Sequence, residues 1–326
     1  MLKLVRLLAA VALCLGAGAS SFAASDFPAD KPVTIIVPFA PGGSVDTGVR
    51  LIVPALERHL GTAVEVQNIG GGGGQSGLTE FVLKAKPDGY TIVNIGLPTV
   101  LTQYHDSSRQ AIYDHSSFLS IGQGWSGAYG IAVPVDSPFN TLQELVEAAR
   151  QAPETITVAD TGRMAAPHLL LAMFESQHDV QFASVHMQGG SAATVALLGG
   201  HVQALVSGSG DFAALLASNS ARILGLAAEE RWEKLPDVPT MTEAGFPFLF
   251  ESRQGFAVPA GTPPEIAATL EQALEAALTD PETLKAFETY GNKADFISGE
   301  RFDEIWTELD RDLAPVIVAL IEAGGA

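Results

Sequence analysis

Apolar residues alternate between two spacings along this chain. The run Val33–Val37 is short, continuous and β-branched, which is typical of a buried parallel strand. From Val45 to Leu60 the apolar residues recur every three or four positions up to Gly61, which predicts an amphipathic helix and its end. The alternation continues with a strand at 64–66, a helix at 78–85 and a strand at 90–95. This β-α-β-α-β order predicts a parallel sheet with right-handed crossovers.

A similar alternation returns in the middle of the chain. It predicts strands at 156–159, 182–186, 202–206 and 223–227, and helices at 168–174 and 191–198. Two apolar segments, 121–133 and 248–258, flank this region and are expected to cross between two lobes. Thr141 and Thr262 each precede a glutamate by three residues, which predicts two capping boxes. We therefore expect an α/β fold in two lobes, with the second lobe inserted into the first.

The first residues have the composition of a secretory signal. Lys3 and Arg6 precede an apolar stretch, Leu7–Ala19, and a small-x-small cleavage site ends at Ala23. We expect residues 1–24 to be a signal peptide, with an uncleaved anchor as the alternative. Cys14 is the only cysteine. Its removal would exclude disulfides, thiol catalysis and cysteine-based metal sites.

The chain is strongly acidic. It has 37 Asp and Glu residues against 18 Lys and Arg, for a formal net charge of −19, and loss of the signal makes it more negative. Such a surface repels nucleic acid and anionic lipid, so we expect no nucleic-acid partner. An anionic small molecule can still bind, because the field in a pocket comes from nearby backbone dipoles and a few cations.

Two glycine-bearing turns follow predicted strands and open predicted helices. They are Pro38–Ser44 and Asn68–Gly77. A helix start presents unpaired N–H groups and the positive end of the helix dipole, and glycine lets a ligand approach that backbone closely. Two such turns side by side predict a cradle for a small anion such as a carboxylate. A glycine turn needed only for tight packing is the alternative.

Other chemistry has little support in this sequence. Gly72–Gly77 matches G-x-G-x-x-G, but Asp88, the acidic residue at the required distance, precedes the next strand instead of ending it. No Gly-Lys-Ser/Thr, no G-x-S-x-G and no zinc-type histidine spacing occurs. We therefore expect no enzyme activity, no cofactor and no metal.

Several charged and aromatic residues could either contact the ligand or have a structural role. Asp46 is expected to complement the first helix start and to orient the turn. Arg163 falls in a turn of the second lobe, where a guanidinium could clamp a second carboxylate or lie in solvent. The same two possibilities apply to Arg253. Histidines and aromatic residues that could line the pocket or instead have local and core partners are His168, His186, Trp125 and Tyr129.

Six segments together resemble one receptor family. They are Val37–Gly43 with Asp46, Asn68 before the glycine run, Pro87–Thr91, Leu198–Gly200, Leu235–Thr240 and Val258–Pro264. In this order they resemble the extracytoplasmic solute receptors of tripartite tricarboxylate transporters, also called Bug receptors. The resemblance covers essentially the whole chain after the signal.

The resemblance implies a two-lobed, type II periplasmic-binding-protein fold that closes on a small organic carboxylate and delivers it to membrane permease subunits. It implies a monomer in the periplasm, with lobe 1 at 25–125 plus 251–326 and lobe 2 at 126–250. Lobe 1 would anchor one carboxylate and lobe 2 would set specificity. The expected ligand-binding residues are Phe39, Ala40, Pro41, Gly42, Gly43, Asp46, Gly73, Gly74, Gln75, Ser76, Thr99, Thr161, Arg163, Gln188 and Gly189.

The chain departs from the family pattern at two places. The usual Asn-Arg-Pro before the glycine run is Asn68-Ile69-Gly70, and the usual Tyr-Lys-Gly turn of lobe 2 is Met187-Gln188-Gly189. Both changes remove a cation, which leaves the ligand open. A sensor that docks on a membrane kinase and a secreted enzyme on the same scaffold are the alternative functions.

Overall fold

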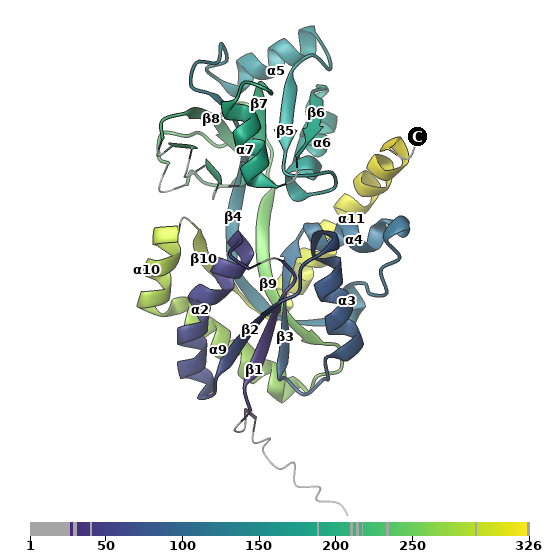
Figure 1. The fold of residues 1–326 in the computed structure, drawn as a ribbon, viewed down its shortest axis with the longest axis vertical. Coiled ribbons are helices and arrows are strands. Elements are labelled where there is room, and N and C mark those ends of the chain that lie inside the picture. Colours follow the sequence, from purple (N-terminus) through teal and green to yellow (C-terminus); the bar gives the residue numbers. More distant parts are fainter. Residues whose placement is uncertain are drawn as a thin grey trace, which may run out of the picture.

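The computed structural model describes residues 27–28, 31–39, 41–187, 189–208, 211–212, 215–216, 218–232, 235–290 and 292–324. The expected signal peptide lies outside these residues. Two bodies are joined by the long strands β4 (Phe118–Pro134) and β9 (Glu251–Pro259), as Figure 1 shows. We name the body that contains β1 lobe 1 and the body that contains β5 lobe 2.

Lobe 1 is built on the predicted parallel sheet. Strand β1 (Val33–Val37) pairs in parallel with β2 (Val64–Asn68) on one side and β3 (Thr91–Leu97) on the other. Helices α2 (Ser44–Leu60) and α3 (Gln75–Lys84) are the crossovers. These elements confirm the predicted β-α-β-α-β order. The strands end toward lobe 2 (Figure 1), so the turns that follow them face it.

Lobe 1 also contains elements without a strong sequence signal. Helix α4 (Thr99–His105) follows β3, and β10 (Lys293–Ile297) pairs antiparallel with β4.

The remaining lobe 1 helices are α9 (Pro264–Thr279), α10 (Pro281–Tyr290) and α11 (Gly299–Gly324), with short 3₁₀ turns at Gly72–Gly74, Ser107–Arg109 and His115–Ser117.

The two crossing strands make the sheet continuous between the lobes. In lobe 1, β4 and β9 pair antiparallel from Phe118 opposite Pro259 to Ala128 opposite Glu251. Beyond Ala128, β4 pairs with strands of lobe 2 instead. The predicted crossing segments at 121–133 and 248–258 therefore coincide with β4 and β9.

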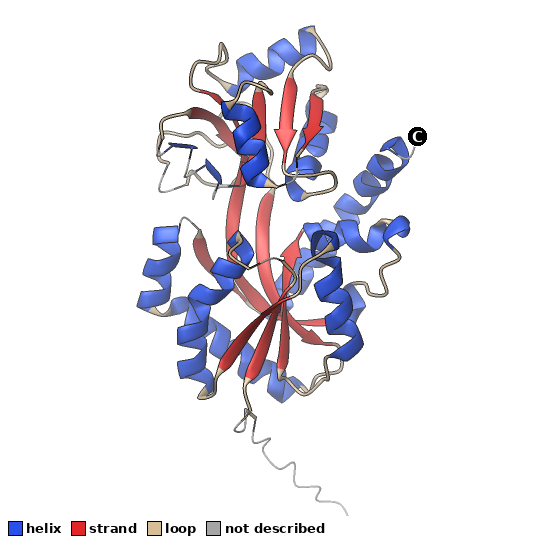
Figure 2. Ribbon diagram, in the orientation of Figure 1, coloured by secondary structure: helices blue, strands red, loops and turns tan. Residues whose placement is uncertain are grey.

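Lobe 2 repeats the parallel arrangement. Strand β5 (Thr157–Asp160) lies between β6 (Ala183–His186) and β7 (Ala204–Gly208) and is parallel to both. Strand β8 (Ala221–Leu226) pairs antiparallel with β4. Helices α5 (Leu142–Gln151), α6 (Ala166–His178) and α7 (Gly190–Leu198) cover this sheet, and the arrowheads of β5 and β6 point toward lobe 1 (Figures 1 and 2).

The two predicted capping boxes have different outcomes. The Thr141 hydroxyl accepts the N–H of Glu144 at 3.2 Å and caps α5, whereas the Glu144 carboxylate accepts the N–H of Asn140 at 2.6 Å instead of that of Thr141, so only the cap half of this box is present. The prediction for Thr262 is wrong, because Pro263 occupies the cap position of α9 and the Thr262 hydroxyl donates to the Pro259 carbonyl at 2.8 Å. Helix α9 begins at Pro264, where the fixed φ of proline suits the first helical position.

Helix α11 extends the core of lobe 1 into lobe 2. Phe302 and Trp306 are fully buried near its start, and Leu313 and Ile317 are buried in its second half. They belong to one apolar cluster with Leu170 of α6. Helix α11 therefore contacts both lobes, beside the two crossing strands (Figure 1).

Candidate functional site

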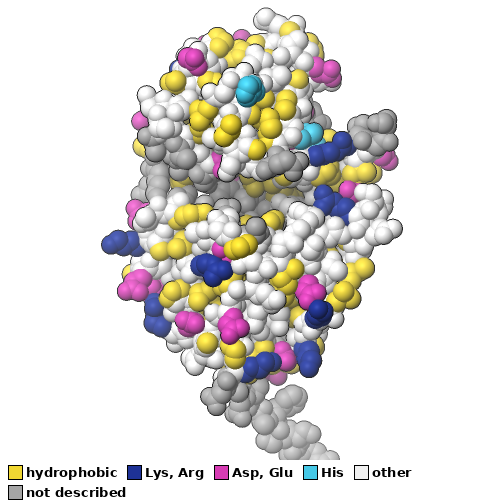
Figure 3. Space-filling view, viewed as in Figure 1, with side chains coloured by type: hydrophobic (Ala, Val, Ile, Leu, Met, Phe, Trp, Pro, Cys, Tyr) yellow, Lys and Arg dark blue, Asp and Glu magenta, His cyan; other side chains and the backbone are white. Residues whose placement is uncertain are grey.

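The surface between the two lobes is hollowed (Figure 3), and the predicted ligand-binding turns lie at strand ends that face this cleft. Turn one (Pro38–Ser44) follows β1 and turn two (Asn68–Gly77) follows β2 in lobe 1. Turn three (161–163) follows β5 and turn four (187–189) follows β6 in lobe 2. Ala40 in turn one and Gln188 in turn four lie outside the described residues.

Asp46 holds turn one from inside. It is in the first turn of α2 and is 2% exposed. Its Oδ2 accepts the N–H of Gly42 at 2.8 Å, and the Nε of Arg50 lies 3.0 Å from both carboxylate oxygens. Asn68, at the end of β2, donates to Oδ1 at 2.9 Å. The carboxylate therefore orients the turn, and its negative charge is paired with a cation.

The ionised form of Asp46 is favoured. Burial by itself raises the pKa of this carboxyl, but hydrogen bonds from Arg50, the Gly42 N–H and Asn68, with the charge of Arg50, lower it below its ordinary value. The anion is thus part of the folded turn.

Turn two is a tight glycine loop. Gly71–Gly74 all have positive φ, at 127°, 58°, 66° and 103°, which residues with a Cβ rarely adopt. The N–H groups of Gly74 and Ser76 donate to the carbonyl of Gly71 at 3.1 and 3.2 Å, and that of Gln75 donates to Gly72. In this conformation the N–H groups of Gly74, Gln75 and Ser76, which are predicted to bind the ligand, thus have acceptors within the turn.

Two side chains from the segment after β3 fix turn two from outside. Gln103 is 2% exposed, and its Nε2 donates to the Gly73 carbonyl at 2.8 Å. Arg109 donates to the Gly72 carbonyl at 3.0 Å, which places a guanidinium beside the glycines. Sequence reasoning missed both residues, because neither belongs to a motif and each contact spans 30 residues or more.

Turns one and two are tied to each other. Asn68 donates from its side chain to the Phe39 carbonyl at 3.1 Å. A Cβ on Gly77 would lie 2.7 Å from the Cα of Pro38, and a Cβ on Gly74 would lie 3.3 Å from the Phe39 ring. The glycines thus let the start of α3 pack directly on the exit of β1.

Turns three and four of lobe 2 are joined in the same way. Gly189 donates its N–H to the Thr161 carbonyl at 3.0 Å. Asp160, fully buried at the end of β5, accepts the N–H of Gly162 at 2.8 Å and contacts His186 Nδ1 at 2.7 Å. The four turns are therefore two coupled pairs, one on each lobe.

Arginines and aromatic residues that could either contact the ligand or have a structural role have local partners in the structure. Arg163 Nη2 lies 3.5 Å from the Leu320 carbonyl of α11. Arg253 pairs with Glu251 at 2.7 Å. Trp125 is 4% exposed and packs on Phe256 and Phe287, which is core packing, and the Tyr129 ring lies 5.9 Å from that of Phe250. Thr99 is the first residue of α4, at the end of β3.

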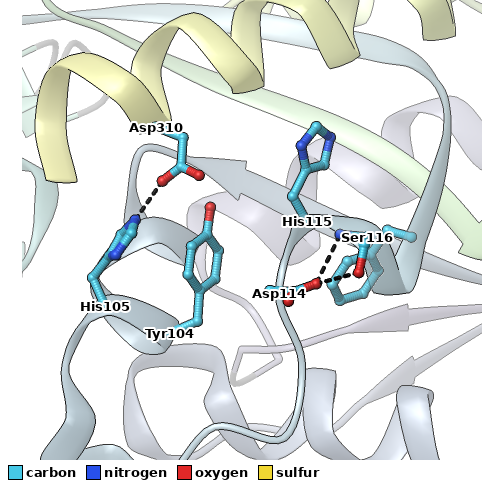
Figure 4. A pocket seen from close by; sticks show the side chains of 7 residues that line it. Tyr104, His105, Asp114, His115, Ser116 and Asp310 are labelled. Atoms are coloured by element: carbon cyan, nitrogen blue, oxygen red, sulfur yellow. Dashed lines mark hydrogen bonds and ion pairs between the residues drawn. The ribbon is translucent and has the colours of Figure 1, made fainter.

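A cavity of about 580 Å³ lies away from these turns, between α4 and α11 (Figure 4). Its polar side chains bind one another. His105 contacts Asp310 of α11, and Asp114 accepts the Ser116 N–H at 2.9 Å. Burial, with Asp310 nearby, raises the pKa of Tyr104. None of the predicted ligand-binding residues lines this cavity.

Two searches of the described residues bear on other functions. Within those ranges, no group of three or more His, Cys, Asp and Glu side chains could hold a metal ion. The helices described in the structure are all too short or too polar to cross a membrane.

Comparison with known proteins identifies the family. The sequence model of the tripartite tricarboxylate transporter family receptor matches residues 49–301. The chain is 29% identical to protein BugT of Bordetella pertussis over 304 residues, which is 89% of this chain and 90% of BugT.

Solved structures of periplasmic binding proteins share the fold. BugD is 27% identical with a TM-score of 0.72, over 90% of this chain and 97% of BugD. MatC of Rhodopseudomonas palustris, solved with bound malate, is 26% identical with a TM-score of 0.74, over 89% of this chain and all of MatC. The fold is the two-lobed type II fold of periplasmic binding proteins. The chain belongs to the tripartite tricarboxylate transporter receptor family, whose members are periplasmic solute-binding receptors.

Proposed function

We propose that this protein captures a small organic carboxylate between its lobes and delivers it to the membrane subunits of a tripartite tricarboxylate-type transporter. The observation that carries this proposal is the coupled pair of glycine turns on lobe 1. They follow neighbouring parallel strands, begin α2 and α3, and are linked through Asn68 and Asp46. Ligands of open α/β sheets bind at such strand ends.

Backbone N–H groups supply the attraction for the ligand. The bonds from Gly74 and Ser76 to Gly71 are 3.1 and 3.2 Å long, at the long end for N–H···O bonds. A carboxylate that took over these donors would gain charge-assisted bonds, which are about twice as strong as neutral ones. Arg109 is held beside the turn by the Gly72 carbonyl and by an ion pair with Asp106 at 3.3 Å, and it places a guanidinium near the site where the Asn68-Ile69-Gly70 sequence lacks a cation.

Malate bound to MatC supports a carboxylate as the ligand class, since MatC is a structural neighbour of this chain. We assign lobe 1 to residues 25–125 and 251–326 and lobe 2 to 126–250. Closure is a hinge motion at β4 and β9. The N-terminal segment acts as a cleaved signal peptide, and the mature protein is a periplasmic monomer without catalytic activity.

A binding screen tests the capture step. The mature chain is titrated with malate, succinate, adipate, butyrate and hexanoate by calorimetry, and melting is followed in parallel because a bound ligand stabilises the fold. At least one acid should bind, and its amide analogue should not. Equal binding of acid and amide, or no binding of any acid, would contradict the proposal.

A second experiment tests closure and delivery. The acid that binds best should reduce the radius of gyration measured by X-ray scattering. Uptake of the labelled acid by cells should require both this protein and the permease subunits. Turnover of the acid by the purified protein would favour the enzyme alternative, and uptake that continues without the protein would argue against delivery.

A further inference from the structure

His186 occupies the ligand-facing end of lobe 2. It is the last residue of β6, directly opposite Asp160 in the parallel pairing of β5 and β6. It immediately precedes turn four, which carries no cation of its own in Met187-Gln188-Gly189. The end of β6 points toward lobe 1 (Figure 1), so this strand ends on the lobe 2 side of the cleft.

Asp160 determines how this imidazole is oriented. Its carboxylate is fully buried, and its second oxygen already accepts the Gly162 N–H. Nδ1 of His186 lies 2.7 Å from Asp160, and an ionised carboxylate, which only accepts hydrogen bonds, would select the tautomer that carries its proton on Nδ1. The other nitrogen, Nε2, is on the opposite side of the ring, and the side chain is 32% exposed.

The neighbouring histidine has a different role. The rings of His168, on α6, and His186 are 4.5 Å apart in an edge-on arrangement. His168 Nδ1 accepts the N–H of Met164 at 3.0 Å. Burial lowers the pKa of His168 to about 4, although Asp160 acts in the opposite direction. His168 therefore stays neutral near pH 7 and supports the turn.

Among the described residues, two other charged groups near the ends of β5 and β6 are Arg163 and Asp211. Arg163 follows β5, but its guanidinium is directed at the Leu320 carbonyl. Helix α7 carries no titratable side chain, and the carboxylate of Asp211 lies against its first residue, Gly190. Asp160 is therefore the charged group in direct contact with the His186 ring.

We propose that His186 is the specificity-determining residue of lobe 2 and that it binds the second carboxylate of a dicarboxylate whose first carboxylate lies in the glycine turns of lobe 1. This inference rests on the proposed receptor function. A protonated Nε2 donates a charge-assisted hydrogen bond to the distal carboxylate. A monocarboxylate of the same length has no group at that position.

The proposal predicts a pH dependence that only dicarboxylates share. Adipate should bind at least about tenfold more tightly at pH 5.5 than at pH 8.0, the change expected for one charge-assisted hydrogen bond. The affinity for hexanoate should change less than about twofold, because it lacks the second carboxylate.

Calorimetry with three variants tests the assignment. His186→Gln should remove the pH dependence for adipate and leave hexanoate unchanged, and His186→Lys should bind adipate tightly at both pH values. The control is His201→Gln, an exposed histidine before β7, at the far end of the lobe 2 sheet from the cleft. It should behave like the wild type.

The outcomes separate this inference from the proposed function. If none of the carboxylates binds the wild type, the receptor proposal fails. If they bind and His186→Gln retains the wild-type affinity and pH dependence for adipate, the assignment of His186 is wrong. If that variant does not fold, the ¹⁵N resonance of Nε2 in the wild type decides: it should shift with adipate and not with hexanoate, and an unchanged resonance overturns the inference.

Discussion

Replacement of Asp46 by asparagine tests the physical basis of the lobe 1 turns. The substitution keeps the shape of the side chain but removes its charge and turns one acceptor into a donor. In the wild type both oxygens receive N–H groups, from Gly42, Arg50 and Asn68. Whichever way the new amide is oriented, its nitrogen faces N–H donors and at least one of these bonds is lost.

The cost follows from these contacts. A hydrogen bond to a charged group contributes about 1.5 to 3 kcal/mol, and the residue is 2% exposed, so water cannot replace the lost partner. We expect Asp46→Asn to lower the free energy of unfolding by about 2 to 3 kcal/mol. The affinity for the best-bound carboxylate should also fall, because Gly42 loses its anchor.

Asp312→Asn is the matched control. Asp312 also pairs with an arginine through two hydrogen bonds, at 2.7 and 3.2 Å from Arg311, but its side chain is 57% exposed. Its loss should leave the free energy of unfolding almost unchanged, because solvent screens an exposed ion pair. Urea unfolding at pH 7 measures both variants. An equal, small effect of the two substitutions would refute the reasoning.

Acid gives an independent check on Asp46. Its pKa is lowered in the folded protein, so the stability it contributes is present above the ordinary value of 3.8 and is lost as the pH falls through the lower folded value. The difference in unfolding free energy between wild type and Asp46→Asn should therefore shrink below pH 3.8. A difference that grows in acid would contradict the assignment.

Four further substitutions test single contacts, the first two by comparing binding with stability. Gly74→Ala and Gly245→Ala both place a side chain at positive φ, which should lower the free energy of unfolding by about 1 to 2 kcal/mol each. Only Gly74→Ala should also weaken carboxylate binding in calorimetry, since Gly245 has open space around it. Gly48→Ala should destabilise the protein by about 1 to 3 kcal/mol in urea unfolding, because the new Cβ would lie 2.5 Å from the Trp125 ring; a more stable variant would show that this ring yields freely. His168→Asn keeps an acceptor for the Met164 N–H but does not titrate. Because the pKa of His168 is lowered to about 4, the wild type should lose up to about 3 kcal/mol relative to this variant between pH 6.5 and pH 4, and equal pH profiles in urea unfolding would contradict this.

Local sequence patterns were sufficient for most of the elements. Val33–Val37 and the helix that ends at Gly61 were predicted because burial periodicity and a glycine end signal act over a few neighbouring residues. The short elements α4 and β10 escaped prediction. Helix α4 has only seven residues, and β10 is defined by its pairing with β4, more than 160 residues earlier in the chain.

By itself the sequence determined the α/β class, the two crossing strands and the positions of the glycine turns, because each depends on local preferences. Only the tertiary structure decided which side chains hold those turns. Arg109 reaches Gly72 across 37 residues, and Arg163 reaches Leu320 across 157. Hydrogen-bond partners so far apart meet only when strand pairing brings their elements together. The sequence therefore located the glycine turns at which we propose that the ligand binds, and the packing of β3, α4 and α11 determined the charges around them.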